Sequence, residues 1–187
     1  MKINLPNRLT LVRIAMIPVF VVLASLAHLW AQAVALVVFA AACFTDYLDG
    51  NIARKRNLVT NFGKFADPIA DKMLVMSAYI VLVGQGRMPA WVCIIFLARE
   101  FIISGFRLVA SGAGTVIAAG MLGKIKTVTQ MIASMMILLL VPVGNMSPLL
   151  GDYGIIASNV MMYIALFMTV WSGADYLYKN RSIIQDM

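Results

Sequence analysis

Six long apolar runs occupy most of this 187-residue chain and limit what it can fold into. The runs fall near residues 9–29, 31–53, 68–84, 89–111, 124–143 and 153–177. Each is close to the roughly 20 residues that an α-helix needs to cross the hydrocarbon core of a bilayer. Charged residues make up only 12% of the chain, about half the share found in soluble domains. The sequence therefore predicts an all-α integral membrane protein with about six transmembrane helices.

The six predicted helices use nearly the whole chain, so we expect a single transmembrane domain over residues 1–187. The opening segment, MKINLPNRLTLVRIAMIPVFVVL, is basic and then apolar, like a signal peptide. Its apolar run is long, however, and no small-residue cleavage site follows it cleanly. We interpret it as an uncleaved first span.

Basic residues are distributed unevenly over the predicted connections. Fourteen of the fifteen lie near the two ends of the chain or around the second and fourth connections, and Arg87 alone lies on the other side. Because lysine and arginine are retained on the cytoplasmic side, we expect both termini in the cytoplasm. The net charge of +7 then indicates contact with an anionic leaflet and no nucleic-acid partner. Aromatic residues are predicted to anchor helix ends at the two interfaces and to do no more: Trp30, Trp91, Tyr153, Tyr176 and Tyr178.

Four of the eight acidic residues lie within thirty residues of one another: Asp46, Asp49, Asp67 and Asp71. On helices, the first two share a face with Gly50 and Ala53, and the last two share a face one turn apart. Four aspartates at the bilayer centre would cost about 10–14 kcal/mol, which approaches the whole stability of a domain. The cluster is therefore expected near the cytoplasmic interface, with its charge neutralised.

Two interpretations of this cluster remain open on the residues alone. The first is a set of salt bridges between the carboxylates and nearby cations, namely Arg54, Lys55, Arg56, Lys64 and Lys72. Alternatively, an oxygen-only ligand set favours hard divalent metals, and two such metals can clamp an in-line phosphoryl displacement. Pro68 is predicted in the first turn of the third helix, with Asp67 near its cap. Asn7 and Thr10 are predicted to cap the first helix in preference to contacting a nucleotide.

The segment DYLDGNIARKRNLVTNFGKFADPIAD resembles the signature of the CDP-alcohol phosphotransferase family, D-x-x-D-G-x-x-A-R followed by G-x-x-x-D-x-x-x-D. All eight specified positions match with the correct spacing, and the resemblance extends over essentially the whole chain. It implies that two divalent cations, Mg²⁺ or Mn²⁺, are held by Asp46, Asp49, Asp67 and Asp71. It also implies that Asp71 is the catalytic base. It further implies a nucleotide site formed by Asp49, Gly50, Ala53, Arg54 and Gly63.

A second basic group flanks the fourth connection: Arg99, Arg107, Lys124 and Lys126. Each alone fits ordinary positive-inside charge, and Glu100 is a candidate partner for Arg99, but together the four indicate an anionic, phosphorylated acceptor. The segments REFIISGFRLVA and GKIKT resemble the phosphatidylglycerophosphate synthases of the family. That implies transfer of the phosphatidyl group from CDP-diacylglycerol to sn-glycerol 3-phosphate. Arg107 and Lys124 are the first candidates for binding the acceptor phosphate, followed by Arg99 and Lys126.

Other functions stay open at this point. Within the family, the acceptor could instead be inositol phosphate, serine or phosphatidylglycerol, the last of which gives cardiolipin. In a different class, intramembrane carboxylates also mark cation channels and transporters. The resemblance further implies a homodimer, located in the cytoplasmic membrane with its active site at the cytoplasmic end of the bundle.

Overall fold

The computed structural model describes residues 5–55, 61–112, 117, 120–144 and 148–181, and within these ranges it is entirely helical apart from turns. Six helices are present in this part of the chain: α1 (Leu5–Ser25), α2 (Leu29–Lys55), α3 (Asn61–Gly84), α4 (Ala90–Gly112), α5 (Met121–Gly144) and α6 (Pro148–Lys179). The backbone of α2 is described to its end, but the side chains of residues 46–55 lie outside the described part. The all-α prediction is confirmed, with one helix for each apolar run.

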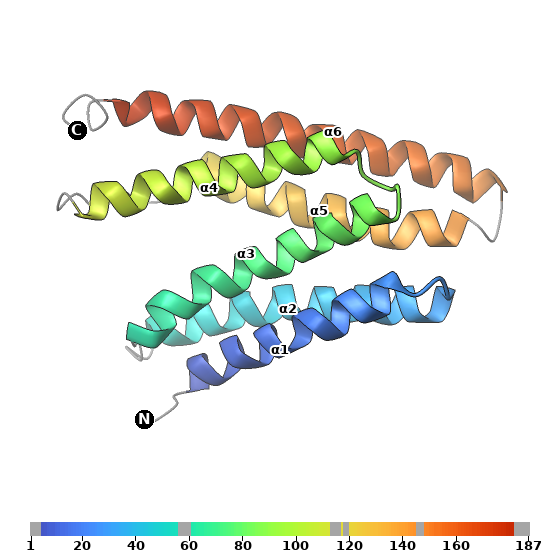
Figure 1. Ribbon diagram of the computed structural model, residues 1–187, viewed down its shortest axis with the longest axis horizontal. Coiled ribbons are helices and arrows are strands. Elements are labelled where there is room, and N and C mark those ends of the chain that lie inside the picture. Colours follow the sequence, from blue (N-terminus) through green and yellow to red (C-terminus); the bar gives the residue numbers. More distant parts are fainter. Residues whose placement is uncertain (1–4, 56–60, 113–116, 118–119, 145–147, 182–187) are drawn as a thin grey trace.

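Successive helices run in alternating directions through the bundle (Figure 1). α1 begins, α2 ends, α3 begins, α4 ends, α5 begins and α6 ends at the same end, on the left of the view. Helix α1 packs against α2 and α3, α5 packs along α6, and α2 also contacts α5. The alternation therefore brings the helix ends that carry most of the basic residues to one end of the molecule.

Aromatic side chains and alanines fill the centre of the bundle. Phe20 of α1 packs on Phe39 of α2 with ring centroids 5.3 Å apart, and Tyr79 of α3 packs on Phe96 of α4 at 5.0 Å. Small residues let the helices approach closely. A Cβ atom on Gly154 of α6 would lie 3.1 Å from a backbone oxygen of α5, so a side chain there would require the neighbouring backbone to shift by a few tenths of an ångström.

The turn between α3 and α4 lies at the opposite end from the start of α1 and the end of α6 (Figure 1). Gly86 adopts φ 68°, the left-handed conformation that glycine accepts without strain. The amide of Arg87 donates to the carbonyl of Leu82 at 2.9 Å, and the amide of Gly86 to that of Val83 at 3.0 Å, which closes the helix with a Schellman motif. The Arg87 guanidinium then donates to Gln32 at 3.0 Å and fastens the turn to α2.

Three of the described helical segments are long and apolar enough to cross a bilayer: Asn7–Ser25, Met121–Leu140 and Gly151–Lys179. Helix α2 contains a shorter apolar stretch, Leu29–Thr45. Helices α3 and α4 are less uniformly apolar, because charged residues interrupt their sequences. The structure is therefore that of a membrane protein, with three helices that meet the length and composition of a span.

Candidate functional site

The two carboxylates of α3 are each bound by a side chain from α1. Asp67 accepts a hydrogen bond from the hydroxyl of Thr10 at 2.5 Å. Asp71 accepts one from the guanidinium of Arg13 at 2.6 Å, in an ion pair. Thr10 and Arg13 are both fully buried, whereas the Asp71 side chain is 42% exposed. The start of α1 therefore supports both carboxylates from the packed side of α3 while Asp71 stays accessible.

The first residues of α1 and α3 correct two predictions about helix ends. Helix α1 begins at Leu5, so Asn7 and Thr10 lie inside it, and the prediction that they cap it is wrong. Helix α3 begins at Asn61, so Pro68 lies inside the helix and Asp67 is not at its cap. Proline in a helix interior removes one backbone hydrogen bond, and the packing of α3 against α1 and α2 outweighs that cost.

The α2 half of the predicted site lies outside the described side chains: Asp46, Asp49, Gly50, Ala53 and Arg54. Their backbone forms the last turns of α2, which ends at the same end of the bundle where α3 begins (Figure 1). Gly63, one turn before Asp67, is buried. Among the described residues, no group of three His, Cys, Asp or Glu side chains is close enough to hold a metal. The donor set nonetheless fits a hard divalent cation, because Asp67 and Asp71 offer carboxylate oxygens one turn apart.

Four cations from three helices lie within electrostatic range of one another, and one of them, Lys72, adjoins Asp71. The four are Lys72, Arg99, Arg107 and Lys126. We call them the basic cluster. Lys72 is within electrostatic range of both Asp71 and Arg107. Arg99 is within range of Arg107, and Lys126 is within range of Arg99 and Lys72. The structure thus brings three of the four predicted acceptor residues into one group and adds Lys72, which donates to Ser104 of α4 at 2.5 Å.

Glu100 is the carboxylate that holds part of this cluster. Lys126 of α5, which is 2% exposed, forms an ion pair with Glu100 Oε1 of α4. Arg99 Nη1 lies 3.6 Å from the same oxygen, so the expected pairing of Arg99 with Glu100 is present. One carboxylate thus serves two cations. Among the described side chains, Arg107 and Lys72 form no such ion pair, so the four cations outnumber the one carboxylate that pairs with them, an excess of positive charge that suits a phosphate.

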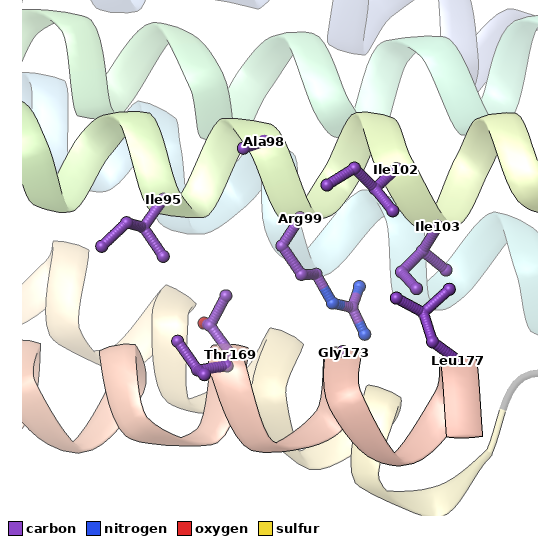
Figure 2. A pocket seen from close by; sticks show the side chains of 9 residues that line it. Ile95, Ala98, Arg99, Ile102, Ile103, Thr169, Gly173 and Leu177 are labelled. Atoms are coloured by element: carbon purple, nitrogen blue, oxygen red, sulfur yellow. The ribbon is translucent and has the colours of Figure 1, made fainter. Parts of the chain in front are cut away.

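Arg99 reaches from α4 across to α6, as Figure 2 shows. Its Nη2 atom donates to Ser172 at 3.2 Å. A Cβ atom on Gly173 would lie 3.3 Å from Arg99 Cγ, so glycine leaves the room through which the side chain passes. Beside it lies a hollow of about 230 Å³, lined mainly by apolar side chains of α4 and α6 such as Ile103 and Leu177 (Figure 2). This arrangement places a guanidinium next to an apolar surface.

Arg107 is held by Tyr176 near the end of α6. Its Nε atom donates to the tyrosine hydroxyl at 3.2 Å, and its guanidinium carbon lies 5.3 Å from the ring centroid. Tyr176 is only 8% exposed and packs edge-on against Phe106. The prediction that Tyr176 is an interfacial anchor without a further role is wrong, because the ring is buried beneath Arg107. Tyr178, by contrast, is 67% exposed.

Lys124 differs from its neighbour Lys126. It lies in the first turns of α5 with an exposed side chain, whereas Lys126 is buried in the basic cluster. Sequence reasoning missed Arg13 and Tyr176 as site residues, favoured a helix cap for Thr10, and named Lys72 only as a salt-bridge candidate for the aspartates. No local signal distinguishes these four from ordinary helix-end residues, because their partners lie on other helices.

The structure is thus a helical bundle in which α3, α4 and α5 carry carboxylates and buried cations. The chain belongs to the CDP-alcohol phosphatidyltransferase family, whose model matches residues 3–171. A Bacillus subtilis (strain 168) protein named CDP-diacylglycerol--glycerol-3-phosphate 3-phosphatidyltransferase is 44% identical, and the match covers 95% of each chain.

Two further relatives carry related names. A Rickettsia typhi protein with the same name as the Bacillus relative is 39% identical, over 92% of this chain and 94% of its own. A Mycobacterium tuberculosis (strain H37Rv) protein named probable phosphatidylglycerophosphate synthase is 41% identical, over 94% of this chain and 81% of its own. The family resemblance inferred from the signature is confirmed, and the chain is an enzyme of this type.

Proposed function

We propose that the protein transfers the phosphatidyl group of CDP-diacylglycerol to sn-glycerol 3-phosphate, giving phosphatidylglycerophosphate and CMP. The names of its relatives support this reaction. The structural observation that carries the proposal is the basic cluster beside Asp71. This arrangement suits an acceptor that carries both a hydroxyl and a phosphate. The cations of the cluster would attract the phosphate, and Asp71 would accept the proton of the hydroxyl.

The reaction needs one bond formed and one broken at the same phosphorus. The C1 hydroxyl oxygen of glycerol 3-phosphate bonds to the lipid-bearing phosphorus of CDP-diacylglycerol, and the bond from that phosphorus to the bridging oxygen breaks. CMP leaves with the bridging oxygen. Asp71 accepts the hydroxyl proton as general base, a role for which its exposed carboxylate is suited.

Two divalent cations, Mg²⁺ or Mn²⁺, are proposed to be held by the four aspartates Asp46, Asp49, Asp67 and Asp71. When bound, they would neutralise charge on the pyrophosphate and on departing CMP. For the nucleotide, Gly50, Ala53 and Gly63 would leave room beside the carboxylates, Asp49 would contribute a ligand, and Arg54 would contact phosphate. Among the described residues of this set, Gly63 supports the proposed nucleotide site, because it is buried one turn before Asp67.

For the acceptor phosphate, we propose Arg107 and Lys124 first, with Arg99 and Lys126 contributing. Arg107 is held over Tyr176, and the Lys124 side chain is exposed, whereas Lys126 is buried and paired with Glu100. A cationic acceptor such as choline would be repelled by the same charges. Inositol phosphate shares the anionic chemistry of glycerol 3-phosphate, so it is the acceptor against which specificity must be measured.

The setting in the membrane is part of the proposal. Helices of 23 to 27 residues, such as α2, α3 and α4, are about 35–40 Å long, enough for the core of a bilayer. We propose that all six helices span it as a single domain over residues 1–187, in the cytoplasmic membrane, with the site end and both termini in the cytoplasm. A homodimer is also proposed, on family resemblance.

The test is CMP release by the purified, detergent-solubilised protein. We expect release to require CDP-diacylglycerol, glycerol 3-phosphate and a divalent cation together, and to stop when EDTA is added and resume when Mg²⁺ or Mn²⁺ is restored in excess. Absence of CMP release under all these conditions contradicts the proposed function. Release that persists in EDTA contradicts the metal assignment alone.

A further inference from the structure

Two residues of α1 contact the two carboxylates of α3 at matched spacing. Thr10 and Arg13 lie three residues apart, and Asp67 and Asp71 lie four apart, so each pair spans about one helical turn. The contacts join residues 57 and 58 positions apart in the chain. Because both form at once, they fix the register of α1 against α3 at the level of the site.

The α1 side chains in these two contacts are buried, which distinguishes the contacts from ion pairs and hydrogen bonds at the surface. Thr10 and Arg13 are each fully buried, so their polar groups depend on partners within the protein. An exposed ion pair contributes little to stability and is easily rearranged. A buried guanidinium packed against one oxygen of a partly exposed carboxylate restricts how that carboxylate rotates, and a buried hydroxyl does the same for Asp67.

We propose that Thr10 and Arg13 are positioning residues, which orient Asp67 and Asp71 for divalent-cation binding and proton abstraction. The inference rests on the proposed function, in which these two aspartates serve as metal ligand and general base. Residues that orient metal ligands typically change metal affinity or activity by about 10- to 100-fold when they are altered. Helix α1 is thus a functional part of the site as well as a packing element.

The first experiment measures Mn²⁺ affinity of the purified full-length protein without substrate, by isothermal titration calorimetry. Thr10→Val keeps the shape of the side chain but removes the hydroxyl, and we expect about 10-fold weaker Mn²⁺ binding. Thr10→Ser restores the hydroxyl and should bind like the wild type. Thr127→Val is the matched control, because the Thr127 hydroxyl is exposed and donates to a carbonyl of its own helix.

Arg13→Lys tests position separately from charge. Lysine keeps the positive charge but lacks the planar guanidinium, so an effect on Mn²⁺ affinity reports orientation of Asp71. We expect about 10-fold weaker binding and a lower kcat, with the KM for glycerol 3-phosphate unchanged. Arg8→Lys is the control, since Arg8 is an exposed cation on the same helix.

Thermal unfolding distinguishes positioning from a purely structural role. If Thr10→Val and Arg13→Lys lower the unfolding temperature but bind Mn²⁺ like the wild type, the inference is overturned. If Arg13→Lys does not fold, the comparison of Thr10→Val with Thr10→Ser decides alone. A wild-type protein with no saturable Mn²⁺ binding would also overturn it. Failure of the proposed function is seen separately, as absence of CMP release by the wild type.

Discussion

Lys126 of α5 and Glu100 of α4 form an ion pair, and Arg99 shares the same carboxylate oxygen at 3.6 Å. The lysine is almost completely buried, at 2% exposure. Among the described side chains, Glu100 is the carboxylate that balances its charge in the packed interior. The pair joins the two helices that carry the four residues first proposed for the acceptor phosphate.

Replacing this carboxylate should destabilise the fold. Glu100→Gln leaves the buried Lys126 without its counter-charge, and breaking a buried pair in this way costs about 3 kcal/mol or more. We expect a clear fall in the free energy of unfolding, measured by chemical or thermal denaturation in detergent.

The matched control for Glu100→Gln is Asp175→Asn. Asp175 pairs with Lys179 one turn later on α6 at 2.9 Å, and the lysine is 66% exposed. Such a pair contributes only about 0.3–0.5 kcal/mol. Equal falls in the free energy of unfolding in the two variants would show that the buried Glu100 pair stabilises the fold no more than an exposed pair does.

Asp71→Asn should abolish most turnover while leaving lipid-nucleotide binding intact. The amide has the size of the carboxylate but does not take the proton of the attacking hydroxyl. General-base catalysis contributes about 10²–10⁴-fold to the reaction rate. The measurement is kcat from CMP release, together with binding of CDP-diacylglycerol by titration. A near-normal kcat would remove Asp71 as the base.

Arg107→Ala should raise the KM for glycerol 3-phosphate more than the KM for CDP-diacylglycerol, because we assign this guanidinium to the acceptor. Tyr176→Phe is a milder change at the same place, because it removes the hydrogen bond to Arg107 but keeps the ring beneath it. A single hydrogen bond contributes about 1 kcal/mol, so its effect on the same KM should be about fivefold. Should Arg107→Ala act mainly on CDP-diacylglycerol, that arginine belongs to the nucleotide site.

Much of the fold followed from the sequence because lipid leaves a chain few options. In hydrocarbon, backbone groups must be satisfied within the segment, so long apolar runs form helices. The six runs correspond to six helices among the described residues. The family also followed from the sequence, because the spacing from Asp46 to Asp71 is specific to one signature and lies within the segment that the family model matches.

Contacts between distant helices could not be predicted in this way. Arg13 looked like one more cytoplasmic cation, and only the packing of α1 on α3 brings it to Asp71. Tyr176 has the composition of an interfacial anchor, but its ring is buried under Arg107. Pro68 suggested the start of a helix, yet α3 begins seven positions earlier, at Asn61. In each case tertiary packing overrides a local preference.

The most direct test of the central claim is competition between acceptors. The purified enzyme would receive CDP-diacylglycerol with equal concentrations of sn-glycerol 3-phosphate, inositol 1-phosphate and serine, and the lipid products would be separated by mass spectrometry. We expect phosphatidylglycerophosphate to predominate, with kcat/KM for glycerol 3-phosphate at least about tenfold above that for any other acceptor. Equal turnover of inositol 1-phosphate, or no product from glycerol 3-phosphate, would contradict the assignment.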